Sequence, residues 1–335
     1  MRYDDVVATK GRPWVVRCDD DAKHVPTTLG DVQRIVIGAG LPRSGTSWWV
    51  QHFVIGRSQG VGANGVSGRV AVRLETNWLA RGEDLARYAQ LFPEKHPAVM
   101  VQKGLWSVGE PMLPWKVRAI LATRAAGRED VVKVALLVRR EGARWESARR
   151  KFGKSGTGMP PASERAWREW RECAAKAYAG VAPEGTEIPQ EAFPSRAWYC
   201  MLWRLPLDAL YRADAQVNAE CMSGGGDAHE MLQKNSRKVW PLWALRWTKV
   251  LGEQNVMLIP YDAAVGNHSR YLRALEDFTG VGPLNHLPPP DESVKKARAP
   301  PSAVDDAWAK VAGIAETDVG FGQPPARLWC PAAAV

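Results

Sequence analysis

Short apolar runs alternate with longer amphipathic segments along this chain. Runs of strand length cover residues 34–38, 70–74, 98–102, 131–138 and 256–259. Patterns with helical spacing fall between or after these runs, over residues 48–55, 84–92, 115–126, 143–152, 162–179, 195–217, 231–251, 269–279 and 304–316. Strands that alternate with helices are typical of an α/β fold with a parallel sheet. We therefore predict a single α/β domain in which helices flank a central parallel sheet.

The two ends of the chain lack this regular alternation. Residues 1–32 have weak periodicity, and the segment from residue 287 onward is rich in proline with one helical pattern. We predict an N-terminal leader over 1–32, a main domain over 33–301, and a C-terminal helix with a proline-rich tail over 302–335 that packs on the same domain. No run approaches the ~20 apolar residues of a membrane-spanning helix, so we expect no membrane segment.

Composition excludes several classes of protein before any motif is considered. Of 335 residues, 45% are hydrophobic and 24% are charged, which is typical of a globular protein and excludes disordered, collagen-like and coiled-coil chains. The net charge of +9 suggests an anionic partner. Residues 32–74 hold five arginines and no acidic residue, and residues 139–154 hold seven basic and two acidic residues. We infer that these two segments create positive potential around one bound anion, and we expect no nucleic acid partner.

The five cysteines are scattered along the chain and form no CxxC pair. Such a set argues against a zinc site and against a dense disulfide framework. We therefore predict a reduced, cytoplasmic environment. The alternative is the Golgi lumen, if an anchor has been removed from the chain.

Residues 38–47, with the sequence GAGLPRSGTS, lie between a predicted strand and a predicted helix. At such a place, backbone N–H groups and a helix N-terminus can hold an anion. The dinucleotide fingerprint GxGxxG fails because Arg43 replaces its third glycine, and the P-loop pattern GxxxxGK[ST] fits only in part because Thr46 replaces its lysine. Two further interpretations are a loop that holds a phosphate with Arg43 as its cation, and a structural glycine-rich turn.

A second anion site is predicted where the apolar run over 133–138 ends in Arg139. An arginine at the carboxyl edge of a parallel strand points into the crevice where ligands of such sheets bind. Ser147 follows eight residues later, in a predicted helix, and can face the same crevice. A guanidinium and a hydroxyl together suit a terminal phosphate. A surface arginine and an unrelated serine on a helix are the alternative.

Both motifs resemble those of the PAPS-dependent sulfotransferases, whose donor is 3′-phosphoadenosine 5′-phosphosulfate. Residues 41–48, LPRSGTSW, resemble the loop that binds the 5′-phosphosulfate. Arg139 and Ser147 resemble the motif that binds the 3′-phosphate, although Arg140-Glu141 stands in place of the usual Asp-Pro. The resemblance covers most of residues 34–301 and implies a P-loop-like sulfotransferase fold, PAPS as the donor, 3′,5′-ADP as the product and no metal. It assigns donor binding to Arg43, Ser44, Gly45, Thr46, Ser47, Trp48, Arg139, Ser147 and Arg298.

Sulfuryl transfer needs a base for the acceptor proton and cations near the sulfate oxygens. The motif order resembles the heparan-sulfate branch of the family, which uses a glutamate, and this resemblance implies Glu75 as the base. Glu75 is also the first acidic residue after Asp31, and an ion pair with Arg73 is its alternative role. The resemblance further implies that Lys103 stabilises the leaving phosphate. A histidine as the base stays open.

The C-terminal half adds a structural resemblance to the same family. Trp240, Trp243 and Trp247 share one face of a predicted helix, and a strand followed by Tyr261 comes next. A helix that ends at Gly280 completes the family's order of elements. We predict structural roles for these residues.

We therefore predict an enzyme, a sulfotransferase that moves a sulfuryl group to a hydroxyl or amine of a glycan or a small-molecule acceptor. Its sixteen tryptophans offer surfaces on which sugar rings can stack. The sequence leaves the acceptor and the oligomeric state open. Two alternatives from other classes are a P-loop-type nucleotide kinase or NTPase, and a non-catalytic protein that binds polyanions.

Overall fold

The structure is a computed structural model. It describes residues 15–16, 34–40, 70–73, 99–103, 111–124, 131–139, 161–222, 236–261, 264 and 268–280. The chain divides into two compact units, which are described separately below. The first unit comprises Met1–Trp106, Lys116–Arg139 and Asn255–Pro300, and the second comprises Ser107–Trp115, Arg140–Gln254 and Pro301–Val335. The predicted boundaries of leader, main domain and tail stay predictions, because the described residues include little of the leader and none of the tail.

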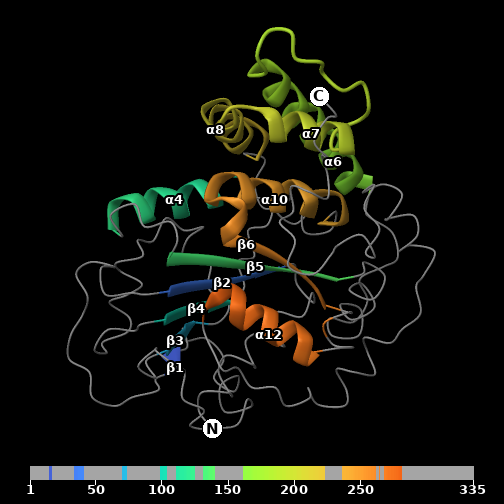
Figure 1. Ribbon diagram of the computed structural model, residues 1–335. Coiled ribbons are helices and arrows are strands. Elements are labelled where there is room, and N and C mark those ends of the chain that lie inside the picture. Colours follow the sequence, from blue (N-terminus) through green and yellow to red (C-terminus); the bar gives the residue numbers. More distant parts are fainter. Residues whose placement is uncertain are drawn as a thin grey trace, which may run out of the picture. The chain divides into compact units, whose positions relative to one another are not determined.

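The described part of the first unit is built on a six-stranded sheet with the order β1-β3-β4-β2-β5-β6 (Figure 1). Its strands are β1 (Val15–Val16), β2 (Arg34–Gly40), β3 (Val70–Arg73), β4 (Val99–Lys103), β5 (Val132–Val138) and β6 (Val256–Pro260). The strands β2 to β6 pair in parallel, and β1 pairs antiparallel with β3. The prediction of an α/β fold with a central parallel sheet is confirmed. The two residues of β1 fall in the segment predicted as a leader, because so short a strand leaves no alternation to detect.

Strand β5 shows why the sheet forms where the apolar runs predict it. Its residues are buried except for Lys133 and Val138, which are half-buried. Continuous apolar strands of this kind are typical of parallel sheets that are covered on both faces. Lys133 donates a hydrogen bond from Nζ to Asn255 Oδ1 at 2.9 Å. The same Nζ lies 5.4 Å from the ring centroid of Phe278 in α12 (His268–Thr279), which places that helix against the sheet.

Strand β2 continues further than its apolar run indicates. The sequence predicts a loop from Gly38 onward, but Gly38 pairs with Lys103 on one side and with Ala135 on the other. The ladder reaches Gly40, which pairs with Leu137 of β5. Glycines inside a central strand are typical of close backbone approach and not only of turns. The predicted anion-binding loop therefore begins after Gly40 and not at Gly38.

The described part of the second unit is helical. Its helices are α6 (Pro161–Gly180), α7 (Arg196–Arg204), α8 (Leu207–Gln216) with a π-helical turn at Val217–Cys221, and α10 (Ser236–Leu251). A further helix, α4 (Leu113–Arg124), crosses the division between the units after Trp115, and a 3-10 turn at Glu253–Asn255 precedes β6. None of the described helices is long and apolar enough to cross a membrane.

The helix predicted over 195–217 is wrong in one respect, since it is two helices. Ser195 caps the start of α7, where its Oγ accepts a hydrogen bond from the backbone N–H of Trp198 at 3.5 Å. The helix ends at Arg204, and the next residue, Leu205, has an extended ψ of 140°. Pro206 explains the break, because proline lacks an N–H and disfavours the helical conformation of the residue before it. The prediction over 162–179 is confirmed by α6, and that over 269–279 by α12.

Aromatic side chains fill the core of the second unit. Trp167 stacks on Trp170 with ring centroids 5.1 Å apart, and Phe193 contacts both Trp170 and Trp198. Of the seven tryptophans whose burial is described, all but Trp203 are buried. Their structural role is confirmed for the helix face that carries Trp243 and Trp247, and the side chain of Trp240 lies outside the described residues. The buried tryptophans are therefore core residues and not a sugar-binding surface.

A disulfide joins Cys173 of α6 to Cys221 at the end of the π-helical turn, with their Cα atoms 5.7 Å apart. Cys200 is also disulfide-bonded. The scattered cysteines gave no sign of the pair, because its members are 48 residues apart and meet only when α6 and the turn pack together. The described helices of the second unit are thus held by a covalent link as well as by their core.

Candidate functional site

The carboxyl ends of β4 and β5, the two neighbours of β2 in the sheet, carry the predicted site residues that the structure describes. Because β4, β2 and β5 are parallel neighbours, their carboxyl ends lie at one edge of the sheet. Lys103 is the last residue of β4 and pairs with Gly38 of β2. Arg139 directly follows β5, two residues after the partner of Gly40. The sheet therefore brings Lys103 and Arg139 to the same edge, on opposite sides of β2.

The order of the strands marks where a ligand fits at this edge. After β2 the next described strand is β3, which lies on the β4 side of β2. After β5 the next described strand is β6, which lies on the other side of β5. Neighbouring strands whose following segments lead in opposite directions form a crevice at their carboxyl ends, where α/β sheets bind ligands. In this sheet the switch lies between β2 and β5, the two strands that directly precede the predicted anion-binding segments.

Arg139 is buried at this switch point and contacts an aromatic ring. Its side chain is only 8% exposed, and its Cζ atom lies 5.0 Å from the ring centroid of Tyr261, which is also buried. Such a cation–π contact steadies a guanidinium without neutralising its charge. Guanidinium groups bind phosphate through N–H donors in a fixed planar arrangement. Arg139 is thus a buried cation at the place where this fold class binds anions.

The strand before Glu75 ends at the same edge. Strand β3 stops at Arg73, which pairs with Gln102 of β4, one residue before Lys103. Glu75 follows two residues later and lies outside the described residues. The other predicted site residues outside the described part are Arg43, Ser44, Gly45, Thr46, Ser47, Trp48, Ser147 and Arg298. Their roles remain predictions.

The described sheet argues further against the dinucleotide interpretation. That fingerprint places its first glycine in a tight turn after the first strand, whereas Gly38 and Gly40 belong to the ladder of β2. Dinucleotide-binding sheets also keep their first two strands as neighbours, whereas β4 lies between β2 and β3 here. The described strand therefore favours an anion-binding loop that begins after Gly40 over a dinucleotide-binding turn that begins at Gly38.

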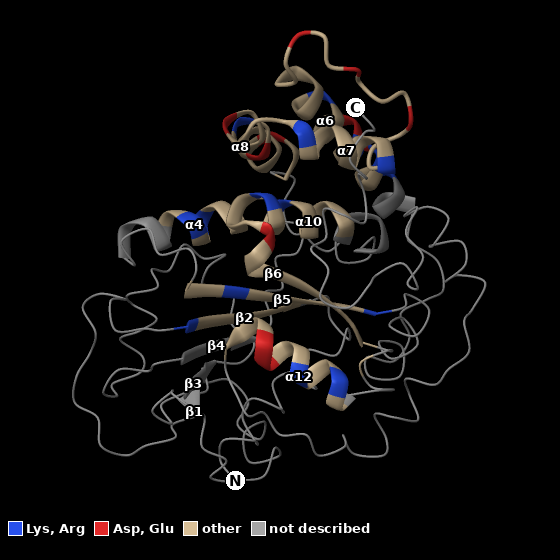
Figure 2. Ribbon diagram, viewed as in Figure 1, with Lys and Arg blue, Asp and Glu red and all other residues tan. Residues whose placement is uncertain are grey.

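The surface of the second unit is not uniformly basic. Figure 2 shows acidic positions along the connection between α6 and α7 and on α8. The connection over 181–195 has three exposed glutamates, Glu184, Glu187 and Glu191, and no Lys or Arg. A protein that binds polyanions along its whole surface would place basic residues in such a segment. The net positive charge of the whole chain is therefore not spread over this part of the second unit's surface.

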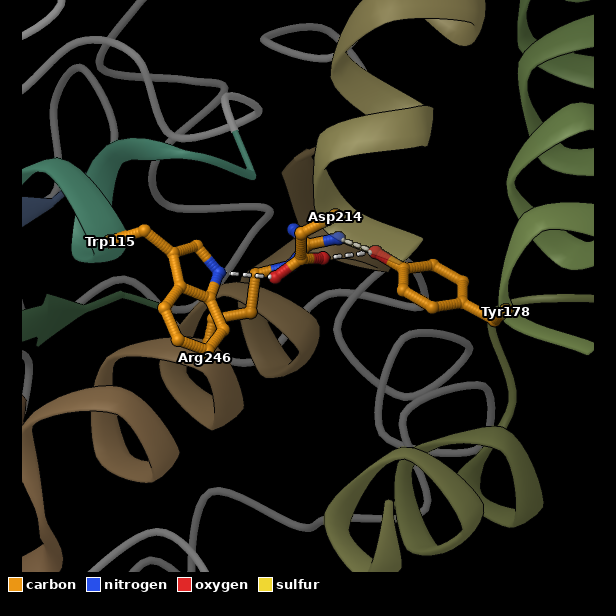
Figure 3. A network of polar contacts seen from close by, with 4 residues as sticks. All are labelled: Trp115, Tyr178, Asp214 and Arg246. Atoms are coloured by element: carbon orange, nitrogen blue, oxygen red, sulfur yellow. Dashed lines mark hydrogen bonds and ion pairs between the residues drawn. The ribbon is translucent and has the colours of Figure 1, made fainter. Parts of the chain in front are cut away.

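A buried polar network in the second unit was not predicted (Figure 3). Asp214 of α8 accepts hydrogen bonds from Trp115 Nε1 at 2.8 Å, from the Tyr178 hydroxyl at 2.7 Å and from Arg246 Nε at 2.9 Å. Arg246 also donates to the Tyr178 hydroxyl. Both charged side chains are almost fully buried, at 0% for Asp214 and 1% for Arg246. Burial raises the pKa of Asp214 above its ordinary value, and the Arg246 guanidinium opposes that shift.

The network links segments that are far apart in the sequence. Trp115 and Asp214 are 99 residues apart, and Tyr178 and Arg246 are 68 residues apart. The charges of Asp214 and Arg246 balance each other, and the four side chains form hydrogen bonds with one another inside the unit. We therefore interpret it as part of the scaffold and not as a reactive centre. No local sequence motif predicts this network, because each of its side chains comes from a different helix.

In the described ranges, no group of three or more His, Cys, Asp or Glu side chains could hold a metal ion. No model of a known protein family matches the sequence, and no curated protein sequence matches it. The motifs, and the sheet edge at which Lys103 and Arg139 lie, are the features of this chain that bear on its function.

Proposed function

We propose that the protein is a PAPS-dependent sulfotransferase, which moves a sulfuryl group from PAPS to a hydroxyl or amine of a glycan or small-molecule acceptor and releases 3′,5′-ADP. One observation carries this proposal. The two segments with phosphate-binding motifs follow β2 and β5, the neighbouring strands that flank the switch point, and the predicted catalytic lysine ends β4 beside them. A buried cation, Arg139, at that position suits a phosphate group.

In this proposal each residue has one task, within a P-loop-like sulfotransferase fold over residues 33–301. Glu75 takes the proton from the acceptor while the sulfur forms a bond to the oxygen or nitrogen of the acceptor and its bond to the bridging oxygen of the donor phosphate breaks. Lys103 stabilises the negative charge that develops on the leaving phosphate oxygen. The remaining residues orient the donor: Arg43, Ser44, Gly45, Thr46, Ser47 and Trp48 at the 5′-phosphosulfate, Arg139 and Ser147 at the 3′-phosphate, and Arg298 as a further contact.

The disulfides bear on the compartment. Disulfides such as Cys173–Cys221 persist in oxidising environments and are rare in the cytosol. Of the two compartments considered from the sequence, we therefore propose the oxidising lumen rather than the cytoplasm. A glycan acceptor agrees with that compartment and with the glutamate branch of the family.

The proposal is tested by thermal unfolding of the full chain with 3′,5′-ADP, with 5′-AMP and with ATP and Mg²⁺. A ligand at 100 times its Kd stabilises the folded protein by about 2.7 kcal/mol, which gives a clear rise in Tm. We expect a rise with 3′,5′-ADP that is much larger than the rise with 5′-AMP. No rise with 3′,5′-ADP would overturn the proposal. A rise only with ATP and Mg²⁺ would identify a kinase or NTPase, and a salt-sensitive rise with any polyanion would identify a polyanion-binding protein.

A further inference from the structure

Arg139 and Tyr261 occupy matching positions on neighbouring strands. The pair Val138 and Pro260 belongs to the ladder between β5 and β6. Arg139 and Tyr261 are the residues that directly follow this pair, at the carboxyl edge. The Arg139 Cζ atom lies 5.0 Å from the centre of the Tyr261 ring. Tyr261 is 7% exposed, so the ring is fixed in the interior and does not move freely at the surface.

The chemistry of this contact suits an arginine that binds an anion. The negative face of an aromatic ring attracts a guanidinium and offsets part of the cost of removing it from water. A ring face offers the guanidinium no acceptor atom, so this contact is compatible with phosphate recognition through the N–H donors. An arginine that is already held in place also loses less conformational freedom when its ligand binds.

We propose that Tyr261 is a positioning residue for the 3′-phosphate site, because its ring holds the Arg139 guanidinium at the carboxyl edge. The inference rests on the proposed function, in which Arg139 binds the 3′-phosphate of the donor. It assigns Tyr261 more than the structural role that the sequence predicts. The ring carries the effect, so Tyr261→Phe keeps it, whereas Tyr261→Leu removes it.

The experiment measures the Kd of 3′,5′-ADP and of 5′-AMP by calorimetry, for the full chain and for both variants. The two ligands differ only in the 3′-phosphate, so the ratio of their Kd values reports on that group alone. Tyr261→Leu lowers the preference for 3′,5′-ADP about tenfold, and Tyr261→Phe leaves it within about twofold. In an Arg139→Gln background, which has already lost the preference, adding Tyr261→Leu lowers it no further.

The outcomes separate this inference from the proposed function. If the unaltered protein does not prefer 3′,5′-ADP, the proposed function fails whatever Tyr261 does. If the unaltered protein prefers 3′,5′-ADP and folded Tyr261→Leu keeps that preference, Tyr261 is only a core residue and the inference is overturned. The same holds if Tyr261→Leu weakens the binding of both ligands by the same factor. Should Tyr261→Leu fail to fold, pentafluorophenylalanine at position 261 keeps the ring's shape and reverses its quadrupole. An unchanged preference with that ring overturns the inference as well.

Discussion

Two buried arginines, one in each unit, both lie over a tyrosine ring, and one of them, Arg246, also forms an ion pair with a buried carboxylate. Arg246 lies within α10, where its Nε donates to the carboxylate of Asp214 at 2.9 Å and its charge is balanced inside the protein. Arg139 lies at the end of β5, where its guanidinium lies over the ring of Tyr261. A carboxylate neutralises a buried cation, whereas an aromatic ring steadies it and leaves its charge in place. Burial of an arginine therefore does not by itself reveal its role, and the ion pair with a buried carboxylate is the feature that marks Arg246 as part of the scaffold.

The largest effect that tests this comparison is expected at Arg246. In Arg246→Met the Asp214 carboxyl stays buried without its cation, and we expect a loss of about 3–5 kcal/mol in the free energy of unfolding. Urea denaturation followed by circular dichroism measures the loss. Arg139→Met is the matched control: it should lose the preference for 3′,5′-ADP and cost much less stability. Equal destabilisation by the two substitutions would show that Arg139 is part of the scaffold, as Arg246 is, and that the two arginines do not differ in role.

A second variant shows whether the Arg246 effect comes from the unpaired charge. Adding Asp214→Leu to Arg246→Met removes both charges, and apolar residues in place of a buried ion pair are often tolerated. We expect the double variant to regain part of the stability lost in Arg246→Met. The recovery stays partial because the Trp115 indole and the Tyr178 hydroxyl then lack their acceptor. If the double variant is less stable than Arg246→Met, packing and not charge dominates the site.

The two arginines also differ in what the sequence reveals about them. Arg139 ends a long apolar run, so periodicity alone puts it at the carboxyl edge of a strand, whereas Lys103 was assigned through the resemblance to the sulfotransferases. Asp214 and Arg246 lie 32 residues apart on two helices, and nothing local marks them as a pair. The position of a residue along a parallel strand is a local property. The partner of a buried charge depends on how the helices pack against one another. The pattern of apolar and polar positions in a single sequence does not reveal that packing.

The same distinction explains the other successes and failures. The five apolar strands were predicted because buried parallel strands are continuous apolar runs. The end of β2 was misplaced because Gly38 and Gly40 suggest a turn, although close packing in a central strand also selects glycine. Pro206 was visible in the sequence, yet the apolar positions on both sides of it suggested one helix. Of the predicted site, only Lys103 and Arg139 can be compared with the described structure.

The disulfide gives the next largest effect and sharpens the contrast between the units. Replacing Cys173 and Cys221 together by alanine removes a cross-link that closes a long loop, and we expect a loss of about 2–4 kcal/mol in the free energy of unfolding. The 3′,5′-ADP preference should persist in the folded variant, because neither Arg139 nor Ser147 lies within the loop of chain that this cross-link closes. Reductant should destabilise the unaltered protein at least as much, because Cys200 is also disulfide-bonded. A lost preference with intact folding would mean that the cross-link acts on the donor site.

The smallest effect concerns Lys249, a cation of the second unit that is only half-buried. Its Nζ donates to the backbone oxygen of Trp203 near the end of α7 and lies 5.5 Å from the Trp203 ring centroid. Burial lowers the pKa of Lys249 from 10.5 to about 8. Between these two pH values the unfolded chain binds more protons than the folded protein, so stability rises with pH across this window.

The size of the effect follows from exposure, and a variant isolates it from other titrations. Solvent screens a half-exposed charge, so the gain between pH 8 and pH 10 should be about 1 kcal/mol rather than the full value of the pKa shift. The free energy of unfolding is measured at both pH values for the unaltered protein and for Lys249→Met, in which this gain is absent. Parallel pH profiles would show that Lys249 keeps its ordinary pKa. Lys249 then shows what partial burial costs a cation whose described partners are a backbone oxygen and an aromatic ring.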